Sequence, residues 1–271
     1  MGEQADERRM TGGWQTTVHE RDGVVYRSPK PQSTTVLALL RHLRSNGFTA
    51  APEVIGDGLA PDGREMLRFV PGAIQQPDPW DDEAIALVGE LVRHLHDAGK
   101  GFDPPTPPVW QPWFTRALPG DRPVIGHGDL GPWNIVTRSG VPVALIDWDN
   151  AGPVDATWDL ADAAWLNVQL HDDDIAERNG LPDAAGRAAQ LRVMLDAYGL
   201  EHQRRDRFVD QLAELAIHAA ADEAVQGGVT PTSTTAVDGQ GFPVMWAVAW
   251  RARSASWILR HRDLLRRAVG A

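Results

Sequence analysis

The stretch VIGHGDLGPWNIVTRSGVPVALIDWDNAGPVDATWDLA, residues 124–161, holds the most informative pattern in the chain. Within it, Asn134–Thr137 and Pro142–Ile146 have the composition of two short strands. Ser139-Gly140 lies between them and is typical of a tight turn. We therefore predict a β-hairpin in the middle of this stretch.

Three oxygen-bearing side chains are expected to converge around this hairpin. Asn134 and Asp147 are 13 residues apart, with the turn near their midpoint, so the hairpin returns both to the same end. Asp129 lies just before the first strand, on a loop that contains Gly128 and Gly131. The sequence therefore predicts a cluster of two carboxylates and one amide.

Such a cluster suits magnesium and phosphate chemistry. Carboxylate and amide oxygens are hard donors, and Mg²⁺ is usually held by one or two side chains together with substrate phosphates and water. A further carboxylate close by can accept the proton of an attacking hydroxyl. This layout is typical of phosphoryl transfer, in which positioning and charge neutralisation provide most of the catalysis.

The same residues form a recognisable signature. It consists of His127-Gly128-Asp129, Asn134 and Ile146-Asp147-Trp148, followed by Asp155 and Asp159-Leu160-Ala161. This pattern resembles that of the aminoglycoside phosphotransferase and choline kinase-like family, which is built like the eukaryotic protein kinases. The resemblance extends over most of the chain and is strongest over residues 124–161.

The order of elements agrees with a bilobal α+β fold of the protein-kinase type. Expected near the N-terminus are a hairpin (Trp14–His19 and Val24–Arg27, turning at Asp22-Gly23), a helix (Thr34–Ser45) and a strand (Glu65–Val70). Expected later are helices over Asp81–Ala98, Asp155–Leu170, Asp183–Tyr198, Arg205–Val225 and Val244–Arg267. Pro71-Gly72 predicts the boundary between a nucleotide-binding lobe, 1–72, and a helical lobe, 73–271, with the catalytic loop, metal site and acceptor site.

The resemblance implies a role for each residue of the signature. Asp129 corresponds to the catalytic base, and Asn134 and Asp147 correspond to the ligands of Mg²⁺. His127 is expected to support the catalytic loop by hydrogen bonding rather than to act as an acid. The implied phosphate donor is ATP or GTP.

Nucleotide-binding residues are also implied by the resemblance. Gly13 precedes the first strand, in the place of a phosphate-covering glycine. Arg27 occupies the position of the lysine that grips the phosphates, and Lys30 lies just beyond it. Phe69 and Val70 correspond to the linker whose backbone contacts the base.

The sequence departs from the family pattern at one position. In protein kinases the phosphate-binding lysine pairs with a glutamate of the following helix. Here the helix expected over Thr34–Ser45 contains no acidic residue, and Val36 stands where the glutamate would be. This departure puts the usual ion pair in doubt and leaves open a protein that has lost catalysis.

Charge suggests the chemistry of the acceptor. Residues 1–72 are neutral overall, whereas residues 73–271 hold 28 acidic against 17 basic side chains. This excess argues against nucleic acid and favours a cationic small molecule, although it is equally typical of a soluble surface.

Candidate carboxylates for the acceptor are Asp149, Asp155 and Asp162, with a helix-capping role as the alternative for Asp155. The run Asp172-Asp173-Asp174 is expected to be a solvated loop.

Composition excludes several other classes of protein. The chain has 271 residues and no cysteine, so disulfide scaffolds, zinc–thiolate sites and a cysteine nucleophile are excluded. No apolar run is long enough for a membrane span, and the charged first ten residues do not form a secretory signal. We expect a cytoplasmic protein, and a monomer because one chain of this size can form the whole site.

Two functions follow as hypotheses. The first is a Mg²⁺-dependent small-molecule kinase that phosphorylates a hydroxyl of a cationic acceptor, such as an aminoglycoside or another antibiotic. The alternative is a weakly active or inactive binding or immunity protein on the same fold, which sequesters its ligand. The missing glutamate favours the alternative, and the intact Asp129, Asn134 and Asp147 favour the kinase.

Overall fold

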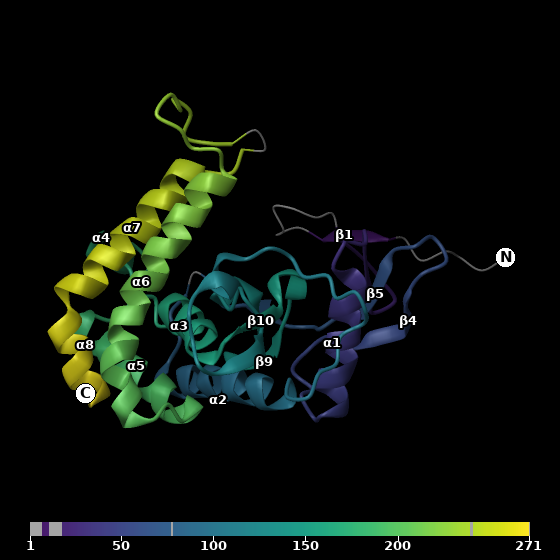
Figure 1. Ribbon diagram of the computed structural model, residues 1–271, viewed down its shortest axis with the longest axis horizontal. Helices are drawn as coiled ribbons and strands as arrows, with labels where there is room; N and C mark the ends of the chain where they lie inside the picture. The colour runs from purple at the N-terminus through teal and green to yellow at the C-terminus, as the bar shows by residue number, and fades with distance from the viewer. Residues whose placement is uncertain (1–6, 11–17, 77, 239–240, 271) are drawn as a thin grey trace.

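A five-stranded antiparallel sheet occupies the N-terminal end of the molecule (Figure 1). The structure is a computed structural model that describes residues 7–10, 18–76, 78–238 and 241–270. The strands stand in the order β1-β2-β3-β5-β4. Their bounds are Arg8–Met10 (β1), Val18–Arg21 (β2), Val24–Arg27 (β3), Val54–Leu59 (β4) and Glu65–Arg68 (β5).

The β2–β3 hairpin forms where the sequence predicts it. Asp22 and Gly23 have φ angles of 53° and 72°, the two positive values that a type I′ turn requires. The part of the predicted strand before Val18 lies outside the described residues, as does Gly13.

Helix α1, Ser33–Ser45, covers part of this region and contacts β4 and α2. Its apolar residues recur at helical spacing, and those of its inner face are buried: Val36, Leu37, Leu39, Leu40 and Leu43. Val36 therefore fills a core position in α1, which accounts physically for the absence of a carboxylate at this place.

Two smaller sheets lie between the N-terminal sheet and the helices. One consists of β6 (Ala73–Ile74), β8 (Ile135–Arg138) and β9 (Val141–Leu145), and the other of β7 (Pro123–Gly126) and β10 (Gly152–Asp155). The predicted hairpin is confirmed, because β8 and β9 turn at Ser139 and Gly140 with φ angles of 52° and 80°. The β7–β10 pair was not predicted.

Helices dominate the remainder of the chain (Figure 1). They are α2 (Asp82–Ala98), α3 (Ala156–Asn167), α4 (Asp173–Arg178), α5 (Ala184–Tyr198), α6 (His202–Gln226), α7 (Val244–Arg260) and α8 (Arg262–Val269). Asp81, Asp155 and Asp183 begin three of them, each accepting a hydrogen bond from a backbone amide of the first turn. These caps explain why the predicted helix starts are close to the observed ones.

Helix α3 is the centre of the helical region. All twelve of its residues are buried, as expected of a helix enclosed by other elements on every side. It contacts α2, α6, β7 and β10. Its carboxylates, Asp159 and Asp162, are therefore held in the interior, beneath the loop that follows β7.

The last predicted helix, Val244–Arg267, is divided in the structure. His261 ends α7, where its ring stacks on Trp257 with centroids 4.2 Å apart and Nδ1 bonds the Trp257 carbonyl at 3.0 Å. The change of direction lets Leu265 and Val269 of α8 reach the core, where both are fully buried. A continuous apolar pattern did not reveal this break.

The run Asp172-Asp173-Asp174 was expected to be a solvated loop; Asp173 and Asp174 are exposed, but the run begins helix α4 and does not form a loop. Asp172 caps α4 and pairs with Arg260 at 2.6 Å and Arg253 at 3.0 Å. Asp173 accepts a hydrogen bond from Trp257 Nε1 at 2.7 Å. The run ties α4 to α7, so its role in the structure is to hold two helices together.

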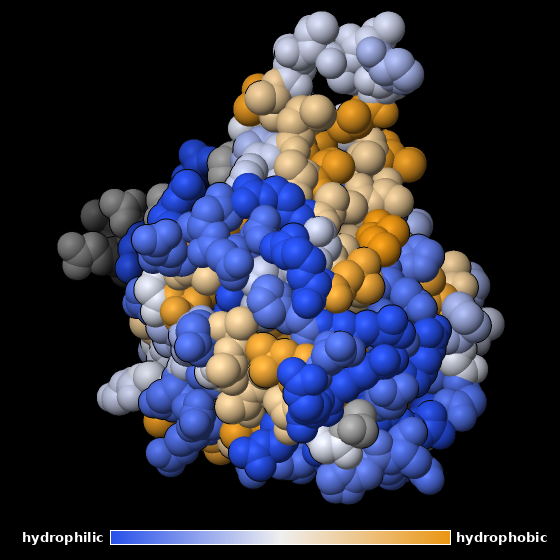
Figure 2. Space-filling model, turned by 90° about the vertical axis from the view of Figure 1, so that its left-hand side faces the viewer, coloured by the Kyte–Doolittle hydropathy of each residue, from blue (hydrophilic) through white to orange (hydrophobic). Residues whose placement is uncertain are grey.

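The outer face of the α6–α7 pair is unusually apolar. Figure 2 shows hydrophobic residues gathered along the upper part of this face. The exposed side chains include Ile217, Met245, Trp246 and Leu259. Among the described residues, no helix combines the length and hydropathy that a membrane crossing requires.

Candidate active site

Asp159 of α3 accepts hydrogen bonds from the backbone of the loop that follows β7. The Gly128 amide donates to Asp159 Oδ1 at 3.0 Å, and the His127 amide donates to Oδ2 at 3.4 Å. Gly128 has φ +79°, and a Cβ there would lie 2.4 Å from the carbonyl oxygen of Asn150. Only glycine fits this position, so the sequence His-Gly-Asp sets the path of the loop.

Asp129 and Asn134 are linked directly at the end of this loop. The Asn134 Nδ2 amide donates to both the carbonyl oxygen and carboxylate Oδ2 of Asp129, each at 2.9 Å. Trp133 Nε1 donates to Asp129 Oδ1 at 3.3 Å. Two donors therefore hold the carboxylate in one orientation, as a positioned proton acceptor requires.

Asp147 leaves the same end of the hairpin as Asn134. The Ile146 amide donates to the Asn134 carbonyl oxygen at 2.9 Å, which joins the two backbones just before Asp147. Asp147 adopts φ +61°, a rare conformation for a residue other than glycine, and its side chain is 56% exposed. The hairpin therefore brings Asn134 and Asp147 together, with Asp147 open to a ligand.

The donor set fits Mg²⁺ rather than a metal enclosed by protein ligands. Within the described ranges, no group of three or more His, Cys, Asp or Glu side chains is arranged to hold a metal. One amide oxygen and one exposed carboxylate remain, and magnesium typically completes such a site with phosphate oxygens and water.

Two cations from the N-terminal region face these carboxylates. Arg27 Nη1, at the end of β3, lies 3.0 Å from Asp149 Oδ1 and 3.8 Å from Asp147 Oδ1. Lys30 Nζ lies 2.5 Å from Asp149 Oδ2. Cations at and just after the end of β3 therefore pair directly with carboxylates that follow β9, so that groups suited to bind phosphate lie beside groups suited to bind a metal ion.

Comparisons with known proteins agree with this geometry. Residues 107–208 match the sequence profile of APH, the phosphotransferase enzyme family. The chain is 52% identical over 264 residues to the trifolitoxin immunity protein of Rhizobium leguminosarum bv. trifolii, covering 97% of this chain and 99% of that protein. The chain belongs to the APH phosphotransferase family.

Solved structures of similar fold confirm the protein-kinase-like α+β architecture. A choline/ethanolamine kinase family protein from Mesorhizobium loti has a TM-score of 0.59 at 18% identity, covering 97% of this chain and 92% of that one. A microcompartment-associated aminopropanol kinase gives 0.59 at 14%, covering 97% and 94%. The GDP complex of aminoglycoside 2'-phosphotransferase-IIIa gives 0.56 at 15%, covering 97% and 92%.

The ion pair that seemed to be missing from this APH-family chain is present in another form. Arg27 pairs with Glu65 of β5, which also accepts a hydrogen bond from Ser33 Oγ. Glu65 is 1% exposed and lies directly opposite Arg27 in the β3–β5 register. Sequence reasoning looked for the carboxylate in the helix and missed it in the strand, where a single acidic residue opposite an arginine was the available signal.

Burial and neighbouring charges shift the pKa values of the three carboxylates of this site. Although burial opposes it, Arg27 and Lys30 hold the pKa of Asp149 below its ordinary value. Partial enclosure and the Asp149 carboxylate raise the pKa of Asp147. Burial, assisted by the Asp147 carboxylate, raises the pKa of Asp129 to about 6. A carboxylate with a raised pKa is a stronger proton acceptor than an ordinary aspartate.

His127 is enclosed beneath the loop. Its ring is fully buried, lies 4.7 Å from the Trp148 ring, and places Nε2 3.0 Å from the Ile146 carbonyl oxygen. Burial lowers the pKa of His127 to about 4, so the imidazole is neutral at physiological pH. Because a carbonyl only accepts, Nε2 carries the hydrogen, and the geometry favours a supporting role.

Three further residues were predicted to bind the nucleotide: Phe69, Val70 and Gly13. Phe69 and Val70 are half-buried after β5, and the Phe69 amide donates to the Gly23 carbonyl oxygen at 2.9 Å. This N–H is therefore committed to the sheet and unavailable to a base. Gly13 cannot be placed, as it falls outside the described ranges.

Of the candidate acceptor carboxylates, Asp155 is used elsewhere. Its oxygens accept from the Thr157 amide at 2.8 Å and the Arg122 amide at 2.7 Å, which makes it the cap of α3 instead. Asp162 is buried beside the loop and accepts from the Leu130 amide at 3.1 Å. Burial and the neighbouring carboxylates raise the pKa of Asp162 well above its ordinary value.

Proposed function

We propose that this protein is a small-molecule kinase that transfers the γ-phosphoryl group of ATP or GTP to a hydroxyl group. The observation that carries the proposal is the carboxylate of Asp129, held by Trp133 and Asn134 next to Asp147. We also propose that residues 1–72 bind the nucleotide and that residues 73–271 bind the acceptor.

Each residue has a defined task in this reaction. Asp129 orients the acceptor hydroxyl and takes up its proton as the new bond to phosphorus forms and the bond to the leaving nucleotide breaks. Asn134 and Asp147 are the residues that would hold Mg²⁺, which neutralises phosphate charge when bound. Arg27, oriented by Glu65, and Lys30 bind the phosphates as cations.

The acceptor proposed for this kinase is a toxin or antibiotic with a hydroxyl group. The relative at 52% identity is named for immunity to trifolitoxin, and phosphorylation is one way in which an enzyme disables such a molecule. The acidic balance of residues 73–271 favours an acceptor with positive charge.

The name of this relative also supports a second function, sequestration of the toxin. An immunity protein can also protect by binding its toxin without chemistry, and the relative is named for immunity rather than for a reaction. In that case nucleotide turnover plays no part in protection.

One experiment separates the two functions. The purified protein is incubated with Mg²⁺ and ATP or GTP against trifolitoxin, aminoglycosides, choline and amino alcohols, and the acceptors are examined by mass spectrometry. A kinase adds one phosphoryl group to an acceptor, and Asp129→Asn does not. A sequestering protein binds the toxin without modifying it, and cells expressing Asp129→Asn remain immune.

A further inference from the structure

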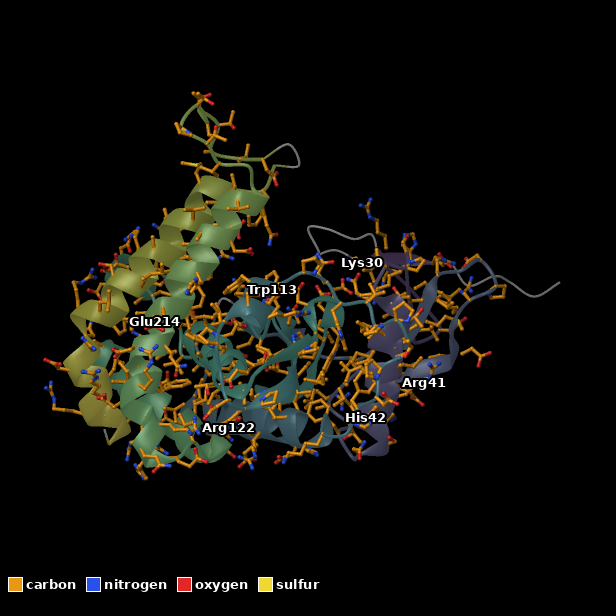
Figure 3. All side chains as sticks on the ribbon, in the orientation of Figure 1. Lys30, Arg41, His42, Trp113, Arg122 and Glu214 are labelled. Atoms are coloured by element: carbon orange, nitrogen blue, oxygen red, sulfur yellow. The ribbon has the colours of Figure 1, made fainter. Side chains whose placement is uncertain are left out.

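A small cavity lies behind the catalytic loop, at the junction of α2, β7, α3 and α5. Its volume is about 160 Å³, which corresponds to about five water molecules at ~30 Å³ each. Figure 3 shows Arg122, which lines this cavity, well separated from Lys30 of the nucleotide region. The cavity is therefore distinct from the candidate active site.

The cavity wall is rich in cations. Arg93, Lys100 and Arg122 line it, whereas Asp97 is the one carboxylate among its lining residues. Asp97 is shared between Arg93 at 2.8 Å and Lys100 at 2.6 Å, so one negative charge faces two positive ones.

Arg122 is the least neutralised of the three cations. Its side chain pairs with Glu201 at 3.5 Å, and Glu201 is shared with Arg204 at 3.2 Å. Ala156, the first residue of α3, also lines the cavity, and the Asp155 carboxylate caps that end of the helix and accepts from the Arg122 amide. The lining residues themselves hold three cations against the one carboxylate of Asp97.

The inner wall of the cavity consists of two buried, hydrogen-bonded groups. His96 is 3% exposed and Tyr198 is 2% exposed, and the Tyr198 hydroxyl lies 2.9 Å from His96 Nδ1. His96 Nε2 lies 2.9 Å from Asp159 Oδ2. Because a carboxylate accepts, Nε2 carries the hydrogen, and Nδ1 accepts from the Tyr198 hydroxyl.

This pair connects the cavity to the catalytic loop. Asp159 is the carboxylate that receives the Gly128 and His127 amides, and Asp129 follows directly in the chain. His96 and Asp159 link the cavity to the loop backbone through hydrogen bonds. A change in the position of His96 therefore alters the support of the loop.

We propose that this cavity binds a small oxyanion, namely free inorganic phosphate, and that the bound ion stabilises the catalytic loop through His96 and Asp159. The guanidinium groups of Arg93 and Arg122 and the ammonium group of Lys100 supply the donors, and a tetrahedral oxyanion accepts from several donors at once. The binding site stands independently of the kinase reaction, and only its consequence for catalysis rests on the proposed function.

The test measures phosphate binding by calorimetry with the nucleotide region saturated by a non-hydrolysable ATP analogue and Mg²⁺. We expect one phosphate per chain, and at least a tenfold loss of affinity in Arg122→Ala. Arg41→Ala is the matched control, because it removes an exposed cation of α1 that lines neither this cavity nor the candidate active site, and it should leave this binding unchanged. Amide hydrogen exchange then follows Gly128, whose exchange should slow at least tenfold with phosphate in the wild type.

Each outcome decides a part of the proposal. The absence of phosphate binding, equal binding in Arg122→Ala, or loss of binding in Arg41→Ala overturns the site. Binding at the site without slower exchange at Gly128 overturns the connection to the loop. None of these measurements uses turnover, so they are independent of whether the protein is a kinase.

Discussion

Arg27 on β3 and Glu65 on β5 occupy opposite positions of an antiparallel strand pair and form an ion pair at the edge of the candidate active site. The pair places Arg27 where its guanidinium also reaches Asp149. A strand-to-strand pair therefore orients the Arg27 guanidinium, which in the proposed function takes the part of the protein-kinase lysine that pairs with a helix glutamate.

Replacing one residue of this pair should destabilise the fold more than replacing both. Glu65 is 1% exposed and Arg27 is its one cationic partner among the described residues, so Arg27→Met leaves a buried carboxylate without its cation at a cost of about 3–5 kcal/mol. Arg27→Met with Glu65→Leu removes both charges and should recover a large part of that loss. Urea unfolding of the two single variants, the double variant and the wild type measures the coupling, and additive effects would show that the two residues act independently.

Arg27 and Lys30 should contribute separately to nucleotide binding. Arg27→Ala is expected to raise the nucleotide KM, because it removes the cation that faces Asp147 and Asp149. The surface variant Arg41→Ala serves as the control. An unchanged KM in Arg27→Ala together with a raised KM in Lys30→Ala would assign the phosphate contact to Lys30 alone.

Gly128 should tolerate no side chain. Alanine there adopts a left-handed conformation, which costs about 1–2 kcal/mol, and its Cβ also meets the Asn150 carbonyl oxygen at 2.4 Å. Gly140 has a similar φ of +80° but nothing within 4 Å, so Gly140→Ala bears the conformational cost alone. Thermal unfolding and kcat of the two variants should differ, with Gly128→Ala the more impaired; equal effects would remove the close contact from the explanation.

Acid should destabilise the helical region through His171. Burial and the Arg187 guanidinium lower the pKa of His171 to about 3, below the ~6.5 of an unfolded chain. The unfolded state therefore binds more protons between these values, and stability falls as the pH drops from about 6.5. The loss between pH 7 and pH 5 is about 2 kcal/mol for this group.

The variant His171→Gln isolates this contribution. Its urea-unfolding free energy should depend less on pH between 7 and 5 than that of the wild type, by about 2 kcal/mol. The exposed His218→Gln is the matched control and should follow the wild type. Identical pH dependence in all three proteins would mean that His171 titrates normally.

Local signals account for what the sequence predicts well. The turns at Asp22-Gly23 and Ser139-Gly140 and the caps at Asp81 and Asp183 depend on neighbouring residues, and all lie where expected. The hairpin that unites Asn134 and Asp147 is likewise local. The fold class and the geometry of the candidate site therefore follow from short stretches of sequence.

Contacts between distant segments account for what the sequence does not show. Glu65 was missed because its partner lies 38 residues away, on another strand. The support of the loop by His96 and Asp159 joins α2 to α3, and no pattern within either helix indicates it. The break at His261 depends on its stacking against Trp257 and on the core that α8 then reaches.

The rate of phosphoryl transfer in Asp129→Asn is the most direct test of the central claim, that Asp129 is the catalytic base of a kinase. With the acceptor found by the panel, we expect kcat to fall by about 10²–10⁴-fold while the nucleotide Kd stays unchanged. Asparagine keeps the shape of the side chain but has one acceptor oxygen, so it can accept from Trp133 Nε1 or from Asn134 Nδ2 but not from both, and thermal unfolding of the variant checks that the fold is intact. A variant that retains the wild-type rate, or a wild type that binds its toxin without modifying it, would contradict the account.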